Sequence, residues 1–268
     1  MSKLALLREA DELMTLLCDA RLPALGAIPW ASPVVSFGNP LTSTVASVGL
    51  NPSNLEFVDA AGLPLEPHNR FETLRTLRLQ SWSRRASVEV QKVWWSCENY
   101  FKHRPYDRWF KPLDRVLADL GVSYYDQSAS ACHLDLVPFA TERKWASLDS
   151  STRAELITHG LPSLVRTIKA SNVRVLVLNG ASVLKTFEQL IDGPPLSKIH
   201  VPRWTLCGGT VSGYAASGRV SSLRGMKLGR EVLVVGFNHN IQSSFGVTRE
   251  VVQDMGRWVG TRARRMLS

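Results

Sequence analysis

The stretch Thr44-Val-Ala-Ser-Val-Gly-Leu-Asn-Pro-Ser53 decides how the rest of the chain is interpreted. Its first half is rich in β-branched residues and carries no charge, which predicts a short buried strand over residues 44–50. Pro52 lacks a backbone N–H and favours an extended conformation at Asn51, so the strand must end there. Asn51 then lies at the carboxyl end of a strand, where open α/β sheets bind their ligands. An Asn-Pro turn without any function also explains these residues, so other parts of the chain must decide.

Composition and charge limit the class of protein. With 268 residues, 44% of them hydrophobic and 21% charged, the chain is an ordinary globular protein by composition. No apolar run approaches the roughly 20 residues of a membrane span, and the N-terminus lacks a signal-peptide pattern, so we expect a cytoplasmic protein. Against 32 Lys and Arg stand 23 Asp and Glu, and the net charge of +9 suits a polyanionic partner such as DNA.

The cysteines give no sign of a disulfide framework or a zinc site. The four of them lie far apart without a C-x-x-C pair: Cys18, Cys97, Cys132 and Cys207. We therefore expect mostly buried thiols.

Hydrophobic periodicity predicts an α/β fold. Three further strands are expected: residues 129–137, which Pro138 ends, and the apolar, Val- and Leu-rich runs 173–178 and 231–236. Helical patterns occupy residues 3–21, 151–169, the stretch from Ala181, and 247–266, and a helix is expected to begin near Asn69. A short strand is expected at Pro33–Phe37, and strand pairs or a loop at 193–230.

These elements predict a three-layer α/β/α fold with a central, mainly parallel, four-stranded sheet. We expect one domain over residues 1–268, with an N-terminal helix at 3–21 and excursions at 72–125 and 193–230. Residues 82–115 are rich in Trp and in basic side chains and should form mixed helices. Their aromatic residues either pack between helices or form a surface that accepts a nucleic-acid strand.

Polar residues follow three of the predicted strands. Asn51 follows the first, Asp135 lies at the end of the second, and Asn238, His239 and Asn240 follow the last. Parallel strands bring such ends to one edge of a sheet, so we expect these side chains to form a site.

At this point the chain resembles the uracil-DNA glycosylase superfamily. Gly49-Leu-Asn-Pro-Ser53 looks like the first motif in its Gly-x-Asn-Pro form, and Gly62–Phe71 is similar to the loop that follows it in the mismatch-specific branch. The segment His133–Pro138 falls where the family has its base-reading strand, and Val173–Phe187 matches the next strand and helix. The segment from His239 to Ser244 falls at the second motif. The resemblance covers residues 40–260 in colinear order.

The resemblance implies an enzyme that flips a nucleotide out of the stack and hydrolyses its N-glycosidic bond. Asn51 would orient the attacking water, and His239 would stabilise the negative charge on the leaving base. No metal or cofactor is implied, since the cysteine spacing of the Fe–S branches is absent.

Two departures from the family pattern concern the target base. Ser53 replaces the tyrosine with which uracil-specific enzymes block substituents at C5. Asp135 replaces the base-reading asparagine, and an ionised carboxylate only accepts hydrogen bonds, which suits an exocyclic amine such as N4 of cytosine. Asp135 could instead be an exposed or helix-capping acid if the register of the match is shifted.

Other positions of the family pattern are filled less clearly. The stacking aromatic falls at Leu65, so Phe57 or Phe71 would supply that face. Asn238 and Asn240 are further candidates for base recognition. The wedge that fills the vacated stack would come from Gln242, Ser243 and Ser244, although the Pro-Ser-Pro pattern is missing.

The leading hypothesis is a monomeric DNA glycosylase that excises a C5-modified cytosine. The superfamily includes bacterial defence enzymes that remove glucosylated 5-hydroxymethylcytosine from phage DNA, and Ser53 and Asp135 suit such a base. One alternative is a repair glycosylase for uracil or another damaged base. Two others are a non-catalytic nucleic-acid-binding module and a hydrolase of small nucleosides or nucleotides.

Overall fold

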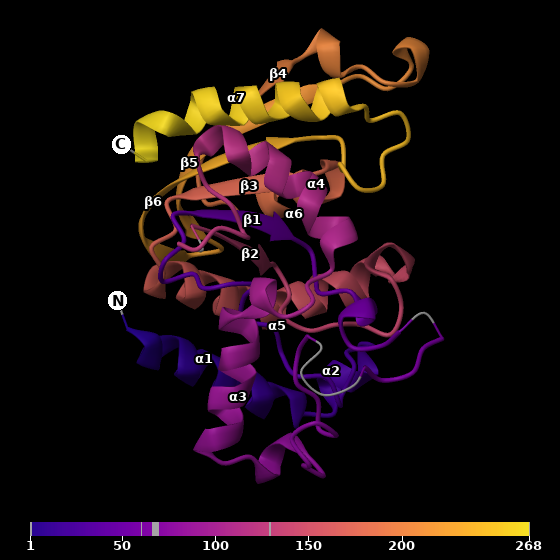
Figure 1. The fold of residues 1–268 in the computed structure, drawn as a ribbon, viewed down its shortest axis with the longest axis vertical. Helices are drawn as coiled ribbons and strands as arrows, with labels where there is room; N and C mark the ends of the chain where they lie inside the picture. The colour runs from indigo at the N-terminus through magenta and orange to yellow at the C-terminus, as the bar shows by residue number, and fades with distance from the viewer. Residues whose placement is uncertain (1, 60, 66–69, 129, 268) are drawn as a thin grey trace. The chain divides into compact units, whose positions relative to one another are not determined.

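The computed structural model describes residues 2–59, 61–65, 70–128 and 130–267. Within these ranges the chain is an α/β protein with seven α-helices and one six-stranded, mixed, mostly parallel sheet (Figure 1). The strands are β1 (Val45–Gly49), β2 (Ala131–Asp135), β3 (Val175–Asn179), β4 (Ser197–His200), β5 (Tyr214–Leu223) and β6 (Met226–Phe237). The helices are α1 (Lys3–Leu17), α2 (Arg21–Ala24), α3 (Ser87–Glu98), α4 (Asp107–Leu117), α5 (Ser150–Ala170), α6 (Ala181–Glu188) and α7 (Arg249–Leu267).

The chain forms two compact units that alternate along the sequence. Unit 1 consists of residues 1–41, 50–105 and 133–171, and unit 2 consists of residues 42–49, 106–132 and 172–268. The prediction of a single domain stays a prediction. Among the described residues, no helix combines the length and the hydrophobicity that are needed to cross a bilayer.

The sheet has the strand order β2-β1-β3-β6-β5-β4. β3 is parallel to both β1 and β6, whereas β5 is antiparallel to β6 and to β4. The four predicted strands are therefore neighbours in the sheet, as expected from their β-branched, fully buried sequences. The predicted number of four strands was nevertheless wrong, because residues 193–230 contribute β4, β5 and the first part of β6. Of the two expectations for that segment, strand pairs or a loop, the antiparallel pairs β4–β5 and β5–β6 confirm the strand pairs.

Unit 2 contains β1, β3, β4, β5 and β6, together with the first two residues of β2, Ala131 and Cys132. Helix α7 packs on β6, β3 and α4, and α6 packs on β3 and β6 (Figure 1). Gly236 in β6 permits this packing, because a Cβ there would lie 2.9 Å from the Leu184 side chain of α6. β1, β3 and β6 end at the same edge of the sheet because they are parallel.

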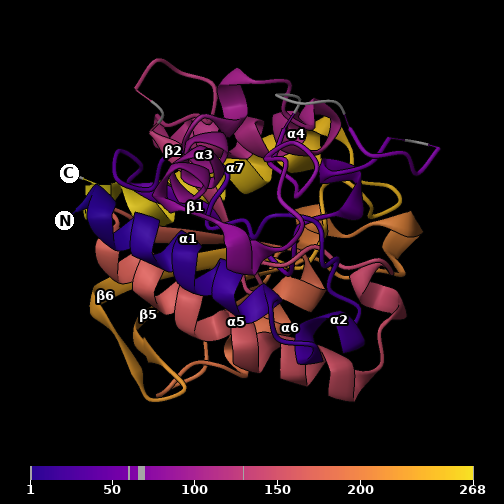
Figure 2. The ribbon, with the colours of Figure 1, turned by 90° about the horizontal axis from the view of Figure 1, so that it is seen from below.

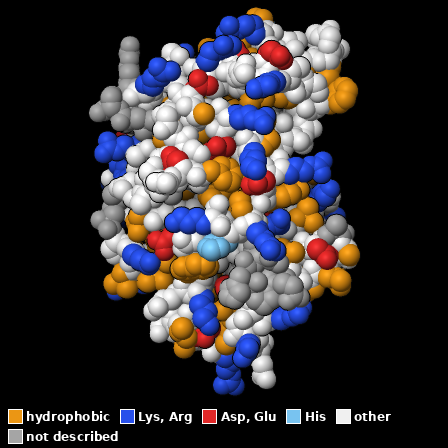
Figure 3. Space-filling model, in the orientation of Figure 1, with side chains coloured by type: hydrophobic (Ala, Val, Ile, Leu, Met, Phe, Trp, Pro, Cys, Tyr) orange, Lys and Arg blue, Asp and Glu red, His pale blue; other side chains and the backbone are white. Residues whose placement is uncertain are grey.

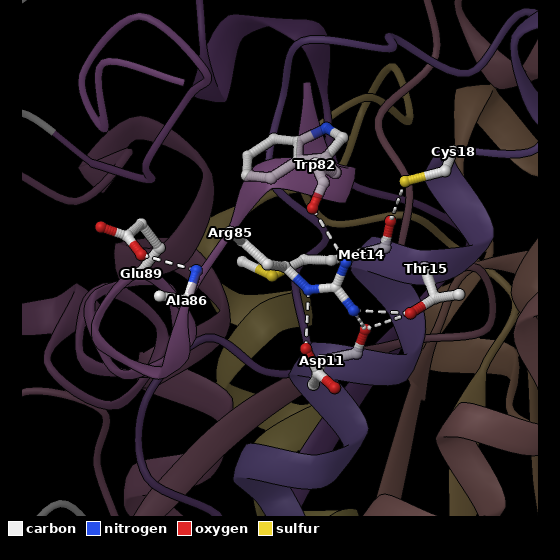
Figure 4. Close-up of polar contacts among 8 residues, drawn as sticks. All are labelled: Asp11, Met14, Thr15, Cys18, Trp82, Arg85, Ala86 and Glu89. Carbon is white, nitrogen blue, oxygen red and sulfur yellow. Dashed lines mark hydrogen bonds and ion pairs between the residues drawn. The ribbon is translucent and has the colours of Figure 1, made fainter. Parts of the chain in front are cut away.

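Unit 1 is built around α1, which packs on α3 and lies alongside α5 (Figure 2). Arg85 ties α1 to the turn before α3: its Nε donates to Oδ1 of Asp11 at 2.6 Å, and its other nitrogens donate to the Trp82 carbonyl and to Thr15 Oγ1 (Figure 4). Gly160 lets α5 approach the chain after β2, since a Cβ there would meet Leu136 O at 2.7 Å.

Three local predictions differ from the structure. α1 ends at Leu17 rather than at residue 21, and the Asp19 side chain accepts the Arg21 N–H in the turn that separates α1 from α2. The described residues 70–81 form turns and no helix, and Asn69, the expected helix start, lies outside the described residues. Pro33–Phe37 contains no strand; Phe37 forms only an isolated bridge with His133.

The thiols are free, as the sequence predicts. Cys97 and Cys132 are buried, whereas Cys18 and Cys207 are exposed, so the expectation of burial holds for half of them. Burial raises the pKa of Cys97 to about 11 and that of Cys132 to about 12. Neither buried thiol is therefore a reactive thiolate at neutral pH.

Candidate functional site

In unit 1, the end of β2 places a histidine and an aspartate on the same side of the strand. His133 and Asp135 are two residues apart, so their side chains leave the same face. The His133 Nε2 lies 3.2 Å from Oδ1 of Asp135, and both side chains are buried. Asp135 is only 8% exposed, and its second oxygen, Oδ2, is buried without a hydrogen-bond partner among the described residues. A buried carboxylate oxygen without a partner is costly, and this one is available for a ligand.

A second buried carboxyl group, that of Glu56, lies in the same unit. The short 3₁₀ turn Asn54–Glu56 begins at Ser53, whose hydroxyl accepts the Leu55 N–H at 3.2 Å. This turn directs Glu56 inward, where it is 3% exposed and its Oε2 accepts a hydrogen bond of 2.8 Å from the Tyr100 hydroxyl. The Arg70 Nε lies 3.7 Å from the same oxygen.

The environment of Glu56 favours its protonated form. Burial, and to a lesser extent the negative charge of Asp135, raise the pKa of its carboxyl to about 7 against the lowering effects of Arg70 and the Tyr100 hydrogen bond. At neutral pH the carboxyl is therefore about half protonated. The negative charge of Asp135 thus favours the protonated form of Glu56, which can donate a hydrogen bond.

Aromatic rings pack around this cluster. Phe37 packs edge-on against Phe71, Tyr100 and His133, with ring centroids 4.9–5.1 Å apart. Phe71 stacks on Tyr100 at 4.9 Å, and Phe57 packs against Phe71 at 5.7 Å. Such an apolar surrounding strengthens every hydrogen bond made inside it.

The residues predicted to stack on a base belong to unit 1 too. Phe57 and Phe71 are buried in the aromatic cluster. Leu65 is half-buried, and its backbone N–H donates to the Phe57 carbonyl at 2.9 Å. Ser53 is exposed at the start of the 3₁₀ turn.

Asn51 is oriented by the segment that follows β2. Its Nδ2 donates to Oγ1 of Thr141 at 3.0 Å and to the Phe139 carbonyl at 3.4 Å. The Thr141 hydroxyl proton is already donated to the Arg143 carbonyl at 2.7 Å, so Oγ1 faces Asn51 as an acceptor. The amide nitrogen must therefore face Thr141. The opposite atom, Oδ1, receives no hydrogen bond from a described residue and is free to accept one from a water.

His239 belongs to unit 2 and is 2% exposed. Its Nε2 lies 2.6 Å from the Trp204 carbonyl. A carbonyl only accepts, so Nε2 carries the proton and Nδ1 is the ring nitrogen left for another partner.

The polar residues beside His239 hold the backbone of unit 2. Oδ1 of Asn238 accepts the Tyr214 N–H at 2.9 Å, and its Nδ2 donates to the Ser212 carbonyl at 2.8 Å. Oδ1 of Asn240 accepts from the N–H groups of Gln242 and Ser243, at 3.0 and 3.1 Å. These bonds occupy the side-chain oxygens of Asn238 and Asn240. The contribution of the two residues to base recognition stays a prediction.

The predicted wedge residues differ in how freely they can move. Gln242 accepts from Nδ2 of Asn179 at 2.7 Å and donates to the Trp109 carbonyl at 2.8 Å, which clamps it from both sides. Ser244 accepts the Asn240 N–H at 2.9 Å, whereas Ser243 is exposed. The next residue, Phe245, is 88% exposed, so the phenyl ring rather than the clamped amide projects from this loop.

A groove of about 470 Å³ lies in unit 2 beside the same loop. Its walls include Pro112 and Arg115 of α4, Ile241 and Val247 of the loop, and Arg249 and Val252 of α7. Neither Arg115 nor Arg249 forms an ion pair with an acid among the described residues, and no acidic side chain lines the groove. The groove therefore suits an anionic ligand with apolar parts.

Several residues of unit 1 were not predicted from the sequence: Glu56, Arg70, Tyr100, His133 and Thr141. Ser53-Asn-Leu-Glu56 has the spacing of a helix-capping sequence, which gives Glu56 a structural explanation. Tyr100 and Thr141 have no local signal, because only the fold brings them to Glu56 and Asn51.

Comparison with known proteins adds no family assignment: no protein-family model matches the chain, and no curated protein matches its sequence. Among the described residues, no group of three or more His, Cys, Asp or Glu side chains is arranged to hold a metal ion. The function must be argued from the residues themselves.

Proposed function

We propose that the chain is a DNA glycosylase that excises a C5-modified cytosine, with glucosylated 5-hydroxymethylcytosine in phage DNA as the best candidate. The reaction would leave an abasic site and need no cofactor. We also propose that the α/β fold is the three-layer α/β/α fold of the uracil-DNA glycosylase superfamily. The observation that carries it is the orientation of Asn51, whose Nδ2 is held by Thr141 while Oδ1 receives no hydrogen bond from a described residue.

In this proposal Oδ1 of Asn51 accepts a hydrogen bond from the attacking water. An amide is too weak a base to remove the proton of the water, but bond breaking ahead of water attack demands positioning above all. The sugar becomes an oxocarbenium-like cation, and the water adds to its C1′. One water proton is then released to solvent as the base departs.

Asp135 would read the base. Its unpartnered Oδ2 is an acceptor in a dry, aromatic surrounding, where an N4 amine would supply the missing hydrogen bond. The same oxygen would discriminate cytosine from uracil, because uracil places a carbonyl oxygen where cytosine has its N4 amine, and two acceptors repel one another. Ser53 has no ring with which to block a substituent at C5.

The leaving base carries negative charge, and the resemblance gives its stabilisation to His239. Since Nε2 donates to the Trp204 carbonyl, this role requires Nδ1, or a local change that frees Nε2.

Two features of unit 2 support DNA as the partner. Phe245 projects from its loop as a bare phenyl ring, which suits stacking between bases. The adjacent groove has Arg115 and Arg249 in its walls, which suits a phosphate backbone. Lys and Arg side chains are also spread over the face drawn in Figure 3, in keeping with the net charge of +9.

The experiment is a glycosylase assay on matched duplexes that differ at one base: glucosylated 5-hydroxymethylcytosine, cytosine, or uracil. We expect abasic sites with the modified cytosine alone. Cleavage of uracil alone would favour the repair alternative and overturn the proposed specificity.

Two outcomes of the same assay would indicate a different class of protein. Salt-dependent DNA binding without any abasic product would indicate a binding module. Cleavage of free nucleosides without affinity for long DNA would indicate a small-molecule hydrolase.

A further inference from the structure

Two buried carboxyl groups in unit 1 border the same aromatic cluster. The Phe37 ring contacts both Tyr100, which donates to Glu56, and His133, which lies next to Asp135. Asp135 has an imidazole partner on Oδ1 and none on Oδ2. Glu56 has a tyrosine hydroxyl on Oε2, and its Oε1 makes no hydrogen bond with a described residue. Each group therefore presents one oxygen that has no hydrogen-bond partner within the part of the chain that the structure describes.

Two ionised carboxylates would both be acceptors, and their charges would repel one another in an apolar surrounding. The edge of cytosine instead presents a donor, the N4 amine, next to an acceptor, N3. One carboxylate and one carboxylic acid are complementary to that edge. The protein offers this combination if Glu56 carries the proton.

We propose that Glu56 acts as a neutral acid that donates a hydrogen bond from Oε1 to N3 of the flipped cytosine, while Asp135 accepts from the N4 amine. This inference rests on the proposed function and extends it to a residue outside the family motifs quoted above. The proton stays on Glu56 throughout, so no bond to it is broken. The hydrogen bond strengthens as negative charge develops on the leaving base, so Glu56 also assists its departure.

The charged and titratable groups that face Glu56 support this assignment. Asp135 raises the pKa of the Glu56 carboxyl, whereas Arg70 and the Tyr100 hydroxyl lower it, and burial outweighs both of the lowering effects. The His133 ring lies next to Asp135 and contacts Phe37. The carboxyl consequently titrates near neutral pH, where its protonated fraction sets the affinity for the base.

The test measures binding separately from cleavage. The probe is a duplex with the modified cytosine on a 2′-fluoro sugar, which resists hydrolysis. The affinity of the protein for this duplex is compared with its affinity for a matched duplex that has unmodified thymine in place of the modified cytosine. For the wild-type protein, the ratio of the two affinities should fall roughly thirtyfold from pH 6 to pH 8.5, as the protonated fraction of a group with a pKa of about 7 falls.

The variant Glu56→Gln keeps an N–H donor and removes the titration. Its affinity ratio should stay within about threefold over the same pH range. Tyr100→Phe provides a second variant: loss of the hydroxyl that lowers the pKa of Glu56 should move the midpoint of the fall to higher pH. A wild-type ratio that does not change with pH, or the same slope in Glu56→Gln, would overturn the inference.

Failure of the inference can be told apart from failure of the proposed function. Each protein is also incubated with the same duplex on an ordinary deoxyribose. Abasic sites together with a flat wild-type binding ratio would remove the role of Glu56 and leave the glycosylase intact. Absence of abasic sites from every modified duplex would remove the proposed function itself.

Discussion

Oγ1 of Thr141 accepts a hydrogen bond of 3.0 Å from Nδ2 of Asn51, and it can only accept because its own proton is donated to the Arg143 carbonyl. The relationship links a strand end to the segment after β2 and fixes which way the amide points. It predicts that the hydroxyl of Thr141 matters to catalysis although it need not touch the substrate.

Thr141→Val should therefore lower the glycosylase rate roughly tenfold, because the amide of Asn51 loses its orienting partner. The free energy of unfolding should fall by about 2 kcal/mol, because the hydroxyl loses its hydrogen bonds to both Asn51 and the Arg143 carbonyl. Thr141→Ser retains the hydroxyl and is the matched control. Single-turnover rates would contradict the account if the valine and serine variants were equally active.

Glu56 should make stability depend on pH. Its pKa is raised from 4.5 to about 7 in the folded protein, so its stabilising contribution is complete below pH 4.5 and is lost as pH rises through 7. Between pH 4.5 and pH 8 the wild type should lose about 3 kcal/mol of unfolding free energy relative to Glu56→Gln. Urea unfolding of both proteins across this range checks the prediction. Parallel stability curves would show that the Glu56 carboxyl ionises normally.

Phe245 should contribute to DNA processing and not to stability, since its side chain is 88% exposed. Phe245→Ala should lower the glycosylase rate on duplex DNA roughly tenfold, in line with the loss of one aromatic–base stacking contact. Its melting temperature should not change. Val88→Ala, at another exposed apolar residue, is the control and should leave the rate unchanged. A normal rate in Phe245→Ala would remove this residue from the proposed DNA contact.

Gly160 should resist substitution even though it lies inside α5. Alanine is the better helix former by up to about 1 kcal/mol, but its Cβ would lie 2.7 Å from the Leu136 carbonyl oxygen and from Val137 Cα. Both atoms belong to backbone, so Gly160→Ala should destabilise the protein by about 1–3 kcal/mol. Thr158→Ala on the exposed side of the same helix should be nearly neutral. Thermal unfolding that ranks Gly160→Ala above the wild type would contradict this packing.

The strands of the sheet could be predicted where the sequence is strongly apolar and rich in β-branched residues. Runs such as Val173–Leu178 and Glu231–Gly236 are β-branched and uncharged over most of their length, and both lie in strands. β4 and β5 were not assigned as separate strands, because β4 is exposed along its whole length and β5 is buried only in part. A half-exposed strand rich in Gly and Ser carries too weak a periodic signal to be located.

The candidate site was predictable only at its strand ends. Asn51 and Asp135 stand out because a polar side chain follows an apolar strand. Glu56 was hidden by its capping-box spacing, and nothing in the local sequence connects it to Tyr100, which is 44 residues away. The same limit applies to Gln242, which the motif order suggested as a wedge and which the structure holds between Asn179 and Trp109.

The central claim is that Asn51 positions the water that attacks the sugar. The most direct measurement is the yield of abasic sites in duplex DNA containing glucosylated 5-hydroxymethylcytosine, for the wild type and for Asn51→Ala. We predict that the wild type forms abasic sites at the modified cytosine, and that Asn51→Ala forms them at least about a hundredfold more slowly while its DNA affinity stays within about twofold. Equal rates in the two proteins, or no abasic sites with either, would contradict the account.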